Sequence, residues 1–187
     1  MVALLIISLI GSAAAYDEEI TFQNIPWCSS IEEVKTILNE LYGEFDCNQF
    51  DGSGSYILNS DGGYFSDWYS YEGQTVTLLI QPKDIEMLGY PLESIRFVFA
   101  TDGEESKLIT IALRPKAPDL SGKTFDKMVG TFVDDTIGQY GKPKKNDSSQ
   151  FILCGGENTA IYMYKGRDEF MWFGRTDAST IIESMIK

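Results

Sequence analysis

The sequence contains no histidine. Ser-His-Asp and Cys-His hydrolases need histidine as a base, and zinc and copper sites commonly need an imidazole, so these chemistries are excluded. The glycine pair at 155–156 lacks the Gly-Lys-Ser/Thr sequence of a phosphate loop. The Asp-Gly-Ser-rich stretch at 51–63 lacks the further acids and the final Glu of an EF-hand. We therefore expect no cofactor, no metal site and no catalytic residue.

Cysteine is scarce, and the count of three is odd. Cys28, Cys47 and Cys154 therefore allow at most one intramolecular disulfide, and their spacing matches no metal site. A Cys28–Cys47 bridge across the predicted helix between them is just feasible but strained. Cys154 lies in an apolar run and is expected to pack as a small hydrophobic residue. We expect mostly free, buried thiols.

Basic residues are nearly absent from the first half of the chain. Residues 1–96 hold fifteen acidic residues against Lys35, Lys83 and Arg96, a net charge of −12, and residues 97–187 contribute only −1 to the total of −13. This field repels phosphate, so nucleic acid and anionic membranes are poor partners, whereas a cationic protein would be attracted. The alternative is that the acids only keep the protein soluble.

Charge is also absent from residues 1–15, which are apolar and end in Gly-Ser-Ala-Ala-Ala. This layout is typical of a secretory signal peptide, and it is too short to span a bilayer. A signal peptide normally begins with a positive charge, which is missing, so a buried first strand or helix is the alternative. We expect a secreted or extracytoplasmic protein, located outside the cytoplasm or at the cell envelope, whose mature chain starts near Tyr16 and has no membrane span.

Ser30 and Glu33 form a capping box that predicts a helix ending at Gly43. Its apolar stripe consists of residues at helical spacing: Val34, Ile37, Leu38 and Leu41. A second helix is predicted over 122–140, and a short one over 177–187, capped by Asp177 with Ile181, Ile182, Met185 and Ile186 inward.

Runs rich in aromatic and β-branched residues predict strands. They cover residues 64–71, 75–80, 94–100, 108–113, 150–154, 159–165 and 169–175. Residues 46–63 are interpreted as a loop with one short strand at 56–58.

This order of elements predicts an α+β fold of two helix-then-antiparallel-sheet units, with the helices packed on one face of a meander sheet. The units would span residues 16–116 and 117–187 after the signal peptide at 1–15. They could share one continuous sheet and so form one domain.

Three landmarks carry a family resemblance: Phe22–Val34 with its Ile-Pro-Trp-Cys-Ser sequence, Gly89–Leu92, and Tyr140–Pro143 with its Tyr-Gly-Lys-Pro sequence. They resemble a group of small exported bacterial proteins of unassigned function. That group usually has Gly at the position where this chain has Cys28. The arrangement is also distantly similar to the β-lactamase-inhibitor-protein family, built from tandem helix-plus-sheet units. The resemblance implies this fold and no activity.

The candidate binding surface combines an aromatic strand with acids of the first helix: Tyr64, Asp67, Trp68, Tyr69, Glu40 and Glu44. Exposed Tyr and Trp side chains stack on sugars or anchor protein partners, although core packing would also explain them. Our leading hypothesis is a non-enzymatic exported protein that binds another macromolecule, as an inhibitor or envelope-associated module. The alternative is a carbohydrate-binding module or carboxylate-based hydrolase.

Overall fold

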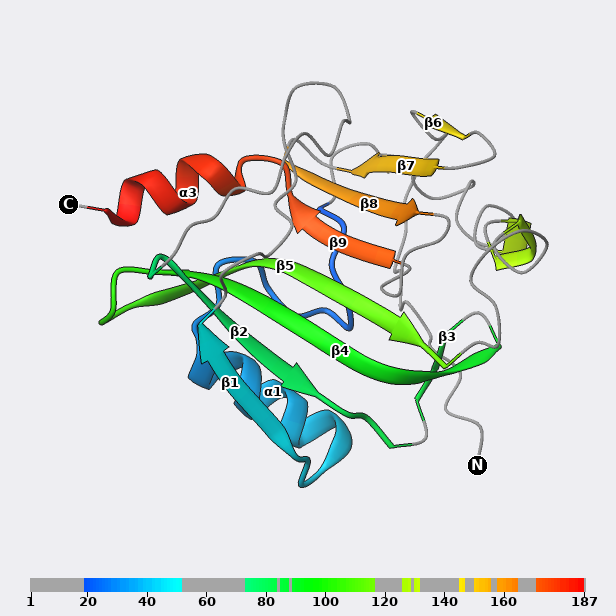
Figure 1. Cartoon of the computed structure of the whole chain (residues 1–187), viewed down its shortest axis with the longest axis horizontal. Helices are drawn as coiled ribbons and strands as arrows, with labels where there is room; N and C mark the ends of the chain where they lie inside the picture. The colour runs from blue at the N-terminus through cyan, green and yellow to red at the C-terminus, as the bar shows by residue number, and fades with distance from the viewer. Residues whose placement is uncertain are drawn as a thin grey trace.

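The computed structural model describes residues 19–51, 73–83, 85–87, 89–116, 126–128, 130–131, 145–146, 150–155, 158–164 and 171–186. Within these ranges the chain is an α+β protein built on one antiparallel sheet (Figure 1). The helices are α1 (Ile31–Tyr42) and α3 (Ala178–Met185), and residues 126–128 and 130–131 are also helical. The expected signal peptide at 1–15 lies outside the described residues.

The strands are β1 (Cys47–Asp51), β2 (Thr75–Ile80), β3 (Glu86–Met87), β4 (Tyr90–Thr101), β5 (Ser106–Pro115), β6 (Lys145–Asn146), β7 (Gln150–Gly155), β8 (Thr159–Tyr164) and β9 (Met171–Arg175). Their order in the sheet is β1-β2-β4-β5-β9-β8-β7-β6, with β3 paired to the start of β4. The sheet therefore consists of two antiparallel meanders joined where β5 pairs with β9. It runs without a break across the boundary at 116 between the two expected units.

One face of the sheet carries continuous apolar rows across both meanders. Cross-strand neighbours share a face, and one such row is Leu78, Phe97, Ile111, Phe173 and Ile161. All five residues are buried. Each of these side chains contributes roughly 1.5–3 kcal/mol by leaving water, so this row is a main source of fold stability.

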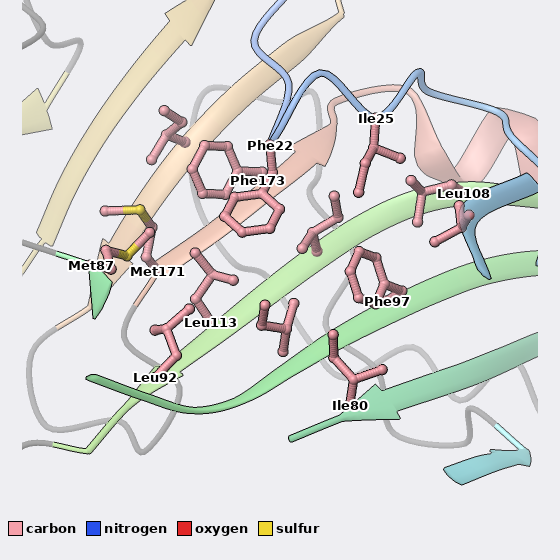
Figure 2. Packing of buried hydrophobic residues seen from close by; sticks show 14 of the residues in the cluster. Phe22, Ile25, Ile80, Met87, Leu92, Phe97, Leu108, Leu113, Met171 and Phe173 are labelled. Atoms are coloured by element: carbon pink, nitrogen blue, oxygen red, sulfur yellow. The ribbon is translucent and has the colours of Figure 1, made fainter. Parts of the chain in front are cut away.

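Residues of the N-terminal segment and of α1 cover this face: Ile20, Phe22, Ile25, Trp27, Val34 and Leu38. The ring of Phe22 packs on that of Phe173, with 5.5 Å between the ring centroids and a 55° tilt (Figure 2). The indole N–H of Trp27 donates a 2.7 Å hydrogen bond to the Ile20 carbonyl. The landmark around Ile-Pro-Trp is therefore a core segment.

The opposite face packs against α3. Val98 and Ile109 are buried there against Ile182, in a cluster separate from the one beneath α1. Successive strand residues point to opposite faces, so Phe97 faces α1 and Val98 faces α3. The expectation that the helices pack on one face fails for α3, whereas Met128 of the helical residues 126–128 is buried in the same cluster as α1. The reason is that β4 and β5 are apolar on both faces, so each face needs a cover.

Most of the predicted elements are present, with changes at their ends. The predicted strand at 75–80 is β2 as expected, and β4 and β5 extend beyond their predicted limits. β1 occupies part of the stretch predicted as a loop, since pairing with β2 orders it. The predicted strands at 56–58 and 64–71 and most of the helix at 122–140 lie outside the described residues.

Two details of the predicted final helix are corrected. Asp177 precedes α3 but forms no side-chain cap, because its carboxylate binds Arg175 instead. Ile186 follows the helix end and is 48% exposed, while Ile182 and Met185 are buried as predicted.

Candidate functional site

The predicted binding surface is only partly within the described structure. Tyr64, Asp67, Trp68 and Tyr69 fall in residues 52–72, outside the described ranges, so the aromatic platform stays a prediction. Glu40 and the nearby Glu44 are described, and both are exposed. The described part of the candidate site therefore comprises α1, β1 and the connection between them.

The acids at the start of α1 are engaged locally. The backbone N–H and hydroxyl of Ser30 donate to Glu33 Oε2 at 2.7 and 2.9 Å, and the Glu33 N–H donates back to the hydroxyl. These hydrogen bonds hold the pKa of Glu33 below its ordinary value. Glu32 forms a 2.9 Å ion pair with Lys35. Both carboxylates stabilise the helix, since acids favour a helix N-terminus.

The end of α1 has the opposite character. Gly43 caps the helix with φ +72°, and its N–H donates 2.9 Å to the Asn39 carbonyl. Glu44 thus lies beyond the helix, and our expectation that Glu40 and Glu44 are neighbours on one helical face is wrong. Among the described residues neither forms a salt bridge, and the last turn of α1 holds no basic residue.

We call Glu40, Glu44 and Asp46 the acidic corner. All three are exposed. Glu40 is on the last turn of α1, and the other two lie in the four-residue connection from α1 to β1. Asp46 directly precedes Cys47, so the acidic corner borders the start of β1, and Figure 1 shows α1 drawn behind this strand.

Strand β1 is the part of this site that sequence reasoning missed. It is the terminal strand of the sheet order among the described strands. Cys47, Asn48, Gln49 and Phe50 are all exposed, and the Phe50 side chain is 47% accessible to solvent. Asn and Asp are depleted from strands, so only the pairing with β2 could have revealed this strand.

The free cysteines correct another expectation. Cys28 and Cys47 are unbridged, as predicted, but both are exposed and not buried. Cys28 lies on the N-terminal segment with φ +63°, and Cys47 begins the exposed β1. The bridge between them that we judged strained does not form. The described residues hold no group of three acidic, cysteine or histidine side chains placed to bind a metal.

A second charged cluster links the N-terminal segment to the β9–α3 corner. Arg175 donates to Asp177 through Nε and Nη2, and to Glu19 Oε1 through Nη1, each at 2.8 Å. The hydrogen bonds from Arg175 hold the pKa of Asp177 below its ordinary value. With both acids bound to it, this guanidinium is structural, and it anchors the segment that covers the core.

No family model, curated protein or solved structure matches this chain. No helix within the described residues is long and apolar enough to cross a membrane.

Proposed function

We propose that this protein is a non-enzymatic binding protein that recognises a cationic macromolecule through the acidic corner. The observation that supports this is the position of the acids Glu40, Glu44 and Asp46. They are exposed and gathered where α1 ends. Bases are favourable at a helix C-terminus, because the helix macrodipole is negative there.

The acidic corner therefore opposes helix stability. A carboxylate near the last turn costs about 0.3–1 kcal/mol relative to a base. Acids placed anywhere on the surface would keep the protein soluble, so solubility alone does not account for this position. Attraction of a cationic partner does account for it, because clustered acids steer such a partner and speed its association.

The wider setting of this proposal is export. An apolar segment at 1–15 that acts as a signal peptide would place the acidic corner outside the cytoplasm. The two meanders, β1-β2-β4-β5 and β6-β7-β8-β9, follow one another along the chain. This order supports the proposal that residues 16–116 and 117–187 are related units, as in the β-lactamase-inhibitor-protein family that the arrangement distantly resembles.

The experiment is capture of partners from the native extracytoplasmic fraction, followed by kinetics with a captured protein. The test variant is Glu40→Lys with Glu44→Lys, which should fold because the dipole favours Lys at this end. The matched control is Glu104→Lys with Glu105→Lys in the exposed β4–β5 turn, which changes the net charge equally.

We expect association to slow in the test variant and less so in the control, most clearly at low salt. Equal slowing in both variants would mean that only the net charge acts. An unchanged rate in the test variant would remove the acidic corner from the proposal.

A further inference from the structure

Strand β1 has the features of a free sheet edge. It pairs with β2 over all five residues without a register shift, and it ends the order of the described strands. Edge strands are usually protected by lysine, proline or a bulge, because their unpaired N–H and C=O groups accept other strands. β1 has no lysine, proline or bulge, and its one charged residue is Asp51, the last residue of the strand. Among the described strands only β2 pairs with β1, so the other backbone edge of β1 can pair with a further strand.

The two faces of β1 differ in chemistry. Gln49 pairs with Leu78, which is buried beneath α1, so Cys47 and Gln49 face the same side as α1. Phe50 pairs with Thr77, so its exposed ring faces the other side. A strand added to β1 would thus meet the α1 side with its acids on one face and an aromatic ring on the other.

We propose that β1 accepts an extended segment of a cationic partner by strand addition, and that this segment alternates basic and apolar residues. Main-chain hydrogen bonds to β1 would supply affinity. Basic side chains on one face would point to the side of Glu40 and the acidic corner, and apolar ones would pack on Phe50. This inference rests on the proposed function and names its partner class and binding mode.

Charge decides between this occupant and a second copy of the chain. Pairing two β1 strands would bring together two molecules that each carry a net charge of −13. Like charges brought together at an interface oppose association. A basic segment removes that repulsion and gains attraction instead.

The test uses end-labelled peptides of about the length of β1 and the full chain, with fluorescence anisotropy at low salt. The probe alternates lysine and valine. One control has the same residues in blocks, so its charge is equal but the alternation is lost. A second control alternates glutamate and valine, which keeps the strand pattern and reverses the charge. Amide hydrogen exchange at residues 47–51 locates the bound strand.

We expect the alternating basic peptide to bind about tenfold more tightly than the blocked peptide, which corresponds to roughly 1.4 kcal/mol. It should also slow exchange of the β1 amides. Phe50→Ala should weaken binding of the alternating peptide and leave binding of the blocked peptide unchanged.

Equal binding of the alternating and blocked basic peptides, or protection away from β1, would overturn strand addition and leave the proposed function standing. Equal binding of the acidic alternating peptide would overturn the cationic partner and leave strand addition standing. Absence of binding by every basic peptide would overturn both.

Discussion

The Cys28 amide donates a 3.1 Å hydrogen bond to the Leu108 carbonyl, and the Leu108 amide donates to Ser29 at 2.8 Å. Leu108 lies at the register shift between β4 and β5, beyond the residues of β5 that pair with β9. The N-terminal segment thus continues the ladder on β5 where β9 has ended. This pairing places Cys28 at φ +63°, a left-handed backbone that disfavours any residue except glycine.

Cys28→Gly is therefore expected to raise the free energy of unfolding by about 1 kcal/mol, because glycine adopts this backbone without strain. Urea denaturation measures the change. Cys28→Ser is the matched control, since it removes the thiol and keeps the strain, and it should differ little from wild type. A glycine variant no more stable than the serine variant would contradict the strain at this position.

The left-handed backbone at Cys28 is a feature that the sequence alone could not supply. Sequence reasoning about Cys28 considered only burial and disulfide pairing, and the exposed, unbridged thiol shows that neither decides its role.

Tyr42 provides a test at high pH. Its hydroxyl is buried without a hydrogen-bond partner among the described residues, and burial raises its pKa to about 12. The unfolded value is about 10. The folded protein favours the neutral phenol. The free energy of unfolding therefore keeps its full value below pH 10 and falls as the pH rises toward about 12, where the tyrosine ionises more readily in the unfolded chain.

Between pH 9 and 11 the free energy of unfolding of the wild type should thus fall by about 1 kcal/mol more than that of Tyr42→Phe. Urea denaturation measures both values. At neutral pH, Tyr42→Phe should be neutral or stabilising by up to about 1 kcal/mol, because no hydrogen bond is lost. Parallel pH profiles for the two proteins would show that the hydroxyl is solvated in solution.

The ion pair of Arg175 and Asp177 should make the free energy of unfolding depend on pH in the acidic range. The pKa of Asp177 is lowered, so its contribution is present above the unfolded value of about 3.9 and is lost as the pH falls through the folded value. Asp177→Asn should lower the free energy of unfolding by about 1 kcal/mol at pH 7, after allowance for partial solvent exposure. At the lowest pH it should have no effect, because the wild-type carboxyl is then protonated too.

Urea denaturation from pH 7 to 2 measures this profile. Glu93→Gln is the control, because the ion pair of Glu93 with Arg114 is solvent-exposed and should be worth less than about 0.5 kcal/mol. If both variants lose stability equally at pH 7, the Arg175–Asp177 ion pair contributes no more to stability than the exposed pair of Glu93 and Arg114.

Local patterns decided how far the sequence could predict this fold. The capping box at Ser30 and Glu33 and the run of β2 involve neighbouring residues, so α1 and β2 were found correctly. β1 depends on pairing with β2, across 23 intervening residues, and its own residues do not favour a strand. The face that α3 covers also depends on pairing, because β4 and β5 are apolar on both sides.

In the candidate site too, the sequence predicted the features set by neighbouring residues but not those set by the pairing of distant strands. Sequence identified Glu40 and Glu44 as exposed acids from composition and helical spacing. The candidate surface counted Glu44 among the helix acids, although the predicted helix end at Gly43 already placed it beyond the helix, and the structure confirms that end. The sequence could not show that Phe50 is exposed, since an isolated Phe is usually buried and only the sheet order puts this one at an edge.

Two phenylalanines therefore give the last prediction. Phe173 is 2% exposed and packs on Phe22 in the core, whereas Phe50 is 47% exposed on β1. Phe173→Ala should cost about 3–5 kcal/mol, because it loses buried area and leaves a cavity. Phe50→Ala makes the same chemical change and should cost less than about 0.5 kcal/mol, because little buried area is lost.

Thermal and urea denaturation of the two variants measure this difference. A retained fold in Phe50→Ala is also what allows that variant to report on peptide binding. If Phe50→Ala destabilises the protein as much as Phe173→Ala, the Phe50 side chain is covered in solution. The edge of β1 would then be closed, and strand addition at that edge would have no free site.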